Sequence, residues 1–63
     1  MKSLWVARDT YGLFQYVGKP SWNISKEWWN PSKQGVYLCS LPNSMFPEVK
    51  IGECKELELK KDQ

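Results

Sequence analysis

The stretch from Glu27 to Leu41 reads EWWNPSKQGVYLCSL and contains two apolar runs separated by a polar segment. The polar segment, residues 30–35, is composed of asparagine, proline, serine, lysine, glutamine and glycine, a composition typical of turns. The pattern predicts a β-hairpin with strands at 27–29 and 36–41 and a six-residue connection.

This hairpin contains two adjacent tryptophans, Trp28 and Trp29, and both large rings need a surface to pack against. Successive side chains on a strand point to opposite faces, so the two rings cannot belong to one core. Residues 36–41 also carry apolar side chains on both faces. We therefore expect the hairpin to lie in the centre of a sheet, with one face on the core and the other offered to a partner. Trp29 is the ring that we expect to face outward.

The first hairpin is predicted from residues 4–17. Leu4–Arg8 and Leu13–Val17 are short, largely apolar runs, and the turn between them starts with Asp9 and contains Gly12. Near the other end of the chain, Lys55–Lys60 alternates strictly between charged and apolar residues, which predicts a strand with Leu57 and Leu59 facing the core.

The remaining segments predict irregular structure. Ser21–Lys26 is interpreted as a loop, with a single helical turn as the alternative. Pro42 and Pro47 bracket four residues, a length that suits one 3₁₀ turn near residues 43–46, with Met45 and Phe46 folded back over the sheet edge. Residues 48–51 are expected to be a short extended piece.

No segment of ten or more residues has the apolar period of a helix. Residues 1–63 are therefore predicted to form one small all-β domain, a five-stranded antiparallel meander curled into an open barrel, with residues 61–63 frayed at the end. A chain of this length buries little apolar surface, so self-association is a common remedy.

Composition excludes several function classes. The net charge of +2 is too small to indicate nucleic-acid binding by itself. The sequence has no apolar run of transmembrane length and no export signal near Lys2, so we expect a cytoplasmic protein without a membrane partner. Without histidine, and with only Cys39 and Cys54, we expect no metal site, no cofactor, no disulfide and no enzymatic activity.

Aromatic residues are the strongest functional signal, because one small core cannot bury them all. Surplus tryptophan and tyrosine on a surface usually anchor a protein partner or a self-dimer. An alternative is stacking of nucleic-acid bases or a nucleotide on the rings, with nearby lysines meeting the phosphates. The candidate binding residues are Trp22, Trp28, Trp29, Tyr37, Lys26 and Lys33.

Three pieces of the sequence together resemble a group of short, uncharacterised proteins of phages, prophages and gut bacteria. They are Leu4–Asp9 (LWVARD), Lys19-Pro20, and Leu41-Pro42 followed by Phe46–Lys50 (FPEVK). The group has no established activity to carry over. Small phage accessory proteins often bind and block a host protein, so the resemblance implies an inhibitory role of that kind.

A second resemblance concerns architecture. Trp28-Trp29, followed by a proline and an aromatic residue in the segment 41–46, is similar to the Src-homology small barrel, which binds proline-rich peptides. The acidic loop typical of that family is missing, because Asp9 is the only carboxylate among residues 9–11. The resemblance therefore implies a shared small-barrel architecture rather than the same ligand.

Overall fold

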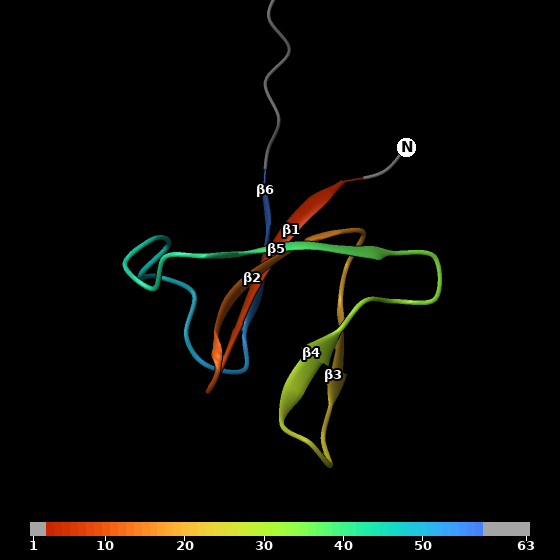
Figure 1. The fold of residues 1–63 in the computed structure, drawn as a ribbon, viewed down its shortest axis with the longest axis horizontal. Helices are drawn as coiled ribbons and strands as arrows, with labels where there is room; N and C mark the ends of the chain where they lie inside the picture. Colours follow the sequence, from red (N-terminus) through yellow and green to blue (C-terminus); the bar gives the residue numbers. More distant parts are fainter. Residues whose placement is uncertain (1–2, 58–63) are drawn as a thin grey trace, which may run out of the picture.

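A computed structural model describes residues 3–57, which form strands and turns and no helix. Within this part of the chain, no helix therefore exists that could cross a membrane. Four strands make an antiparallel sheet in the order β5-β2-β1-β6, and two make a separate antiparallel hairpin, β3-β4 (Figure 1). The strands are β1 (Leu4–Asp9), β2 (Gly12–Val17), β3 (Ser21–Asn23), β4 (Trp28–Asn30), β5 (Val36–Leu41) and β6 (Cys54–Leu57).

The predicted all-β class is confirmed for residues 3–57, but its details are wrong. The described part of the chain has six strands instead of five, and they divide between two sheets instead of forming one meander curled into a barrel. The described residues contain no 3₁₀ turn near residues 43–46. Two successive turns occur there instead, closed by the Met45 N–H on the Pro42 carbonyl and by the Val49 N–H on the Phe46 carbonyl, each at 3.0 Å.

The predicted hairpin over residues 27–41 is also wrong. β4 pairs with β3, whereas β5 pairs with β2 and forms one edge of the larger sheet rather than its centre. Trp22 lies opposite Trp29, with ring centroids 5.2 Å apart, and such a cross-strand pair favours the short β3–β4 ribbon. Part of the segment predicted as a loop, residues 21–26, is therefore strand β3.

The β1–β2 hairpin forms as predicted, although each strand is one residue longer at the turn. The Asp9 side chain accepts a hydrogen bond from the Tyr11 backbone N–H at 2.8 Å, which fixes the turn. Gly12 has a φ of 145°, a value that residues with a Cβ rarely adopt. The sequence at this turn therefore selects both its conformation and the register.

One face of the four-stranded sheet carries the apolar core. Val6 and Leu13 are fully buried on this face, and Val49 from the segment after β5 packs against them. The partly buried side chains around this centre are Leu41, Phe46 and Leu57. Leu57 and Phe46 thus pack as predicted, Met45 is exposed, and Leu59 lies outside the described residues.

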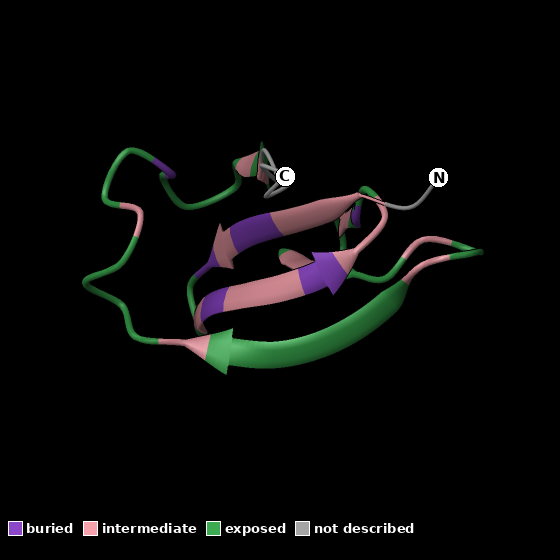
Figure 2. Cartoon of the chain, turned by 90° about the horizontal axis from the view of Figure 1, so that it is seen from above, coloured by how far each residue is buried: buried purple, intermediate pink, exposed green. Residues whose placement is uncertain are grey.

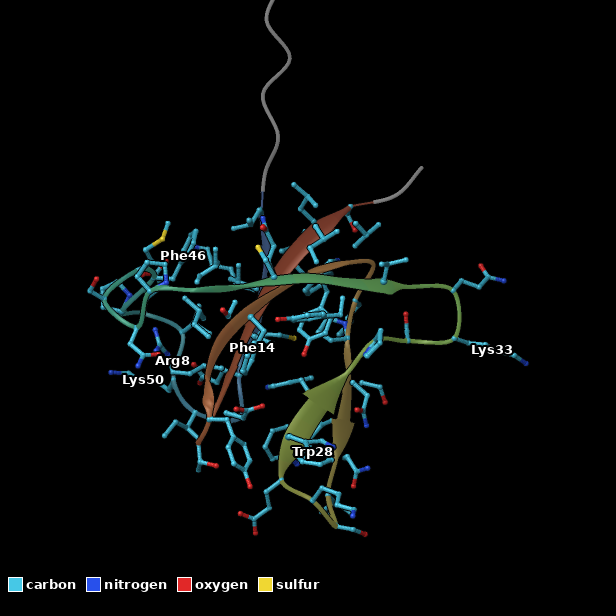
Figure 3. The ribbon with its side chains drawn as sticks, in the orientation of Figure 1. Arg8, Phe14, Trp28, Lys33, Phe46 and Lys50 are labelled. Atoms are coloured by element: carbon cyan, nitrogen blue, oxygen red, sulfur yellow. The ribbon has the colours of Figure 1, made fainter. Side chains whose placement is uncertain are left out.

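Arg8 holds the segment 42–53 against this face. Its Nε donates to the Val49 carbonyl at 2.6 Å, and its Nη2 donates to the carbonyls of Met45 and Phe46 at 2.9 and 3.2 Å. Phe46 adopts a φ of 50°, which is unfavourable for a residue with a side chain. The three hydrogen bonds compensate for this strain and close the core. Figure 3 shows the Arg8 and Phe46 side chains at this end of the sheet.

Candidate binding cleft

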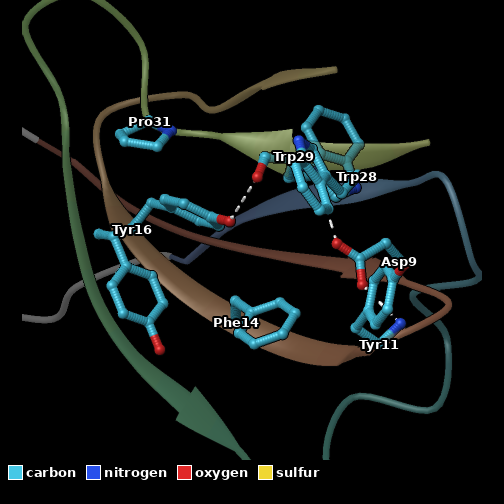
Figure 4. A pocket seen from close by; sticks show the side chains of 8 residues that line it. Asp9, Tyr11, Phe14, Tyr16, Trp28, Trp29 and Pro31 are labelled. Carbon is cyan, nitrogen blue, oxygen red and sulfur yellow. Dashed lines mark hydrogen bonds between the residues drawn. The ribbon is translucent and has the colours of Figure 1, made fainter. Parts of the chain in front are cut away.

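A cleft of about 290 Å³ lies between the small β3–β4 hairpin and the second face of the four-stranded sheet (Figure 4). Strand alternation places Phe14 and Tyr16 on this face, opposite to Leu13 and the core. The residues that line the cleft are Asp9, Tyr11, Phe14, Tyr16, Trp28, Trp29, Pro31 and Tyr37.

The floor of the cleft is a cluster of three rings from β2 and β5. The centroid of the Tyr37 ring lies 6.1 Å from that of Phe14 and 5.8 Å from that of Tyr16. Tyr16 is buried, whereas Tyr37 is 47% exposed. The floor is therefore rigid on the β2 side and open to solvent on the β5 side.

Trp28 and Tyr11 form one wall, with ring centroids 6.0 Å apart. Tyr11 is 70% exposed, so its ring is accessible at the rim. The Nζ of Lys26 lies 5.7 Å from the centre of the Trp28 ring, within range of a cation–π interaction. The buried indole N–H of Trp28 has no hydrogen-bond partner among the described residues. This wall therefore has an unused donor next to an otherwise apolar surface.

Trp29 fastens the small hairpin to the large sheet. Its indole N–H donates to the Arg8 carbonyl at 3.0 Å, and its own carbonyl accepts a hydrogen bond from the Tyr16 hydroxyl at 3.2 Å. Its backbone N–H points to the carboxylate of Asp9 at 3.4 Å. Trp22 packs edge-on against the ring from the neighbouring strand. Trp29 therefore fixes the position of the β3–β4 hairpin over the sheet, and with it the position of the cleft wall.

Asp9 is the only charged residue in the cleft lining, and it is 4% exposed. One oxygen of its carboxylate accepts the Tyr11 N–H and the other faces the Trp29 N–H. Both oxygens are thus occupied by backbone donors, which leaves the carboxylate a positioning role at the junction of the two sheets.

Burial raises the pKa of Tyr16 from its usual value near 10 to about 12, and the negative charge of Asp9 and the neighbouring Tyr37 add to the shift. The folded protein therefore keeps the phenolic proton over a pH range in which the unfolded chain loses it. The resulting stabilisation is complete below pH 10 and is lost as the pH rises through about 12.

We expect the free energy of unfolding to fall by about 2 kcal/mol between pH 10 and pH 12 from this group alone. Urea unfolding followed by tryptophan fluorescence across this pH range measures the loss. Tyr16→Phe is the matched control, because it removes the titrating group and keeps the ring. An equal alkaline loss in the variant would show that other groups cause it.

The structure gathers only part of the predicted binding set. Trp28, Trp29 and Tyr37 line the cleft, and Lys26 lies beside it. Trp22 packs on Trp29 outside the lining. Lys33 lies in the loop between β4 and β5 and points away from the cleft (Figure 3).

Sequence reasoning missed Tyr11, Phe14, Tyr16 and Pro31 as parts of one site. The alternation of Phe14 and Tyr16 along β2 indicated that they share a face. Nothing in the local pattern indicated that the β3–β4 hairpin lies over this face, because that placement depends on contacts between distant segments.

No group of three or more potential metal-ligating side chains occurs within residues 3–57. Cys39 on β5 and Cys54 on β6 lie on opposite edges of the sheet, and both thiols are free. Burial raises the pKa of the Cys54 thiol, which disfavours the reactive thiolate.

Comparison with protein-family models, with curated proteins and with solved structures gave no match for this chain.

Proposed function

We propose that this chain is a non-enzymatic protein-binding module that takes an apolar segment of another protein into the aromatic cleft. The observation that carries the proposal is the concentration of six aromatic side chains and a proline around one open concave surface. Tryptophan and tyrosine bury large areas with little loss of side-chain freedom, and they are the residues most enriched at energetically important positions of interfaces.

The chemistry of the lining favours a polypeptide over a small charged ligand. The one carboxylate in the cleft, that of Asp9, already accepts backbone hydrogen bonds. The unpartnered N–H of Trp28 suits an acceptor such as a peptide carbonyl, which movement of the exposed Tyr11 ring would admit. A peptide segment that presents an apolar side chain followed by a main-chain carbonyl matches the apolar lining and the unpartnered N–H of Trp28.

Three features support a non-enzymatic role. The sequence contains no histidine. The Cys54 thiol has a raised pKa, and the Asp9 carboxylate is occupied by backbone N–H groups. General acid–base or nucleophilic catalysis needs a group that is free to exchange a proton with a substrate. Among the lining residues there is no histidine, cysteine or lysine, and the one carboxylate is engaged in this way.

The partner that we propose is a protein of the host cell, which this chain would inhibit in the manner of a phage accessory protein. This part of the proposal rests on the resemblance of Leu4–Asp9 and Phe46–Lys50 to short phage and prophage proteins. Inhibition requires only that the host protein uses, for its own function, the apolar segment that the cleft holds.

Nucleic-acid or nucleotide binding is the second candidate, supported by Lys26 beside the Trp28 ring. Stacking on the rings with phosphate contacts would use the same cleft. Such binding should weaken steeply between low and physiological salt, whereas insertion of an apolar segment should change little. Salt dependence of the captured partner thus separates the two candidates.

The cleft is tested by truncating rings at its rim. Tyr11→Ala and Tyr37→Ala should each weaken partner binding by roughly tenfold, the effect typical of an aromatic anchor at an interface. Immobilised protein captures partners from host lysate, and the affinity of the purified partner is then measured for each variant by calorimetry.

Ile24→Ala is the matched control, because Ile24 is 81% exposed and is not part of the cleft lining. Circular dichroism verifies that the variants keep the fold. A partner bound equally by the wild type, the control and both tyrosine variants would show that binding does not use the cleft.

A further inference from the structure

One edge of the four-stranded sheet is open. β5 pairs with β2 on one side, and no described strand lies on its other side. Five of its six residues are exposed, and Figure 2 shows the strand along the outer boundary of the sheet. The N–H and C=O groups on that side can therefore accept another strand.

The two edges of this sheet differ in composition. β6, the opposite edge, carries Lys55 and Glu56, and charges of this kind discourage pairing between sheets. β5 has no charged residue and no proline, and its neighbours in sequence are uncharged from Gln34 to Pro47. Its side chains Val36, Tyr37 and Leu38 are 50%, 47% and 44% exposed. Apolar surface is thus concentrated on the edge that lacks charge.

We propose that β5 pairs antiparallel with β5 of a second copy of this chain. A strand that pairs antiparallel with itself about a two-fold axis is self-complementary, so the same residues serve both copies. An uncharged strand gives no preference for an acidic or basic partner and no repulsion between identical copies. The result is one continuous sheet, in which the two β5 strands are central and both charged β6 edges lie outside.

The register change in β5 bears directly on this pairing. Gln15 lies opposite Cys39 and Tyr16 lies opposite Tyr37, so Leu38 is an extra residue that forms a β-bulge. A bulge increases the local twist, and it is the one protective feature that residues 3–57 show on this edge. It interrupts the pairing near the middle of the strand and leaves the residues on either side extended. The dimer should consequently be reversible rather than permanent.

The dimer would also place the two clefts on the same face. A two-fold axis between antiparallel strands runs perpendicular to the sheet, so both Tyr37 side chains point to the same side. A partner with two binding segments could then engage both clefts, which increases the overall affinity without any new contact. The dimer itself does not depend on what the clefts bind.

Sedimentation velocity and light scattering over a wide range of protein concentrations test the proposal. The mass should rise from 7.4 kDa toward twice that value as concentration increases. Leu38→Lys places two like charges near the axis and should weaken association by roughly tenfold or more. Val36→Lys, at the end of the strand, is a second variant in case the first does not fold.

Ile24→Lys is the matched control, since the same change at an exposed site in the β3–β4 turn should leave association unchanged. A protein that stays monomeric at every concentration would overturn the proposal and would show that the bulge is sufficient protection. So would assemblies larger than a dimer, which indicate β5 pairing with β6, or equal association of both folded edge variants and the control.

Discussion

Trp29→Ala is expected to lower the free energy of unfolding by about 3–5 kcal/mol, the cost typical of removing a large, well-packed ring. The variant loses the hydrogen bond to the Arg8 carbonyl and the edge-on contact with Trp22. A domain of this size has little stability to spare, so much of the protein should be unfolded at 37 °C. Urea titration followed by far-ultraviolet circular dichroism measures the loss.

Trp29→Phe separates the ring from its hydrogen bond. It keeps most of the packing against Trp22 and should cost about 1–2 kcal/mol, from the smaller ring and the lost hydrogen bond to the Arg8 carbonyl, which still accepts the Gly52 N–H. Ile24→Ala, at an exposed site, should have no measurable effect on stability. If Trp29→Ala retained wild-type stability, the proposed attachment of the hairpin through this residue would be wrong.

The role of Trp29 affects the choice of binding experiments. The sequence predicts that the Trp29 ring faces outward to a partner. Its contacts with Arg8, Tyr16 and Asp9 show that it positions the cleft wall. Loss of binding in Trp29→Ala would therefore follow from loss of the site, and the exposed rings of Tyr11 and Tyr37 are better probes.

Arg8→Ala is expected to lower the free energy of unfolding by about 3 kcal/mol, because hydrogen bonds to charged groups contribute more than neutral ones. It removes the donors that hold the carbonyls of Met45, Phe46 and Val49. The Phe46 backbone, at a φ of 50°, would then relax and expose the core around Leu13. The midpoint of thermal unfolding measures this loss.

Arg8→Lys provides the matched comparison. A lysine has a single ammonium group and cannot reproduce the fork that serves three carbonyls, so we expect about half of the destabilisation of the alanine variant. Glu48→Gln removes a salt bridge with Lys55 on the exposed surface and should leave stability nearly unchanged. Similar midpoints for Arg8→Ala and Glu48→Gln would contradict the role assigned to Arg8.

The features that depend on neighbouring residues could be predicted from the sequence. The β1–β2 hairpin follows from its turn residues, Asp9 and Gly12, and the limits of β5 follow from an apolar run that ends at Pro42. The strand partners could not be predicted in the same way. β3 has only three residues, and its pairing with β4 depends on the contact between Trp22 and Trp29.

In the candidate site, too, the features set by composition could be predicted, and those set by contacts between distant residues could not. Excess aromatic residues predicted a binding surface, and the predicted residues Trp28, Trp29 and Tyr37 lie in the cleft lining. The cleft itself exists because Trp29 joins β4 to β1 across 21 residues of sequence. A hydrogen bond between an indole and a distant carbonyl leaves no periodic signal, so neither the cleft nor the contribution of Tyr16 to it was predictable.

The strand order has a consequence for synthesis of the protein on the ribosome. β1 is made first, yet it lies between β2 and β6, and β6 is the last described strand to be made. The side of β1 that pairs with β6 therefore remains unpaired until Cys54–Leu57 leave the exit tunnel. The Arg8 contacts with the segment 42–53 must wait for nearly as long. Folding of the large sheet should thus be completed only after β6 has left the exit tunnel.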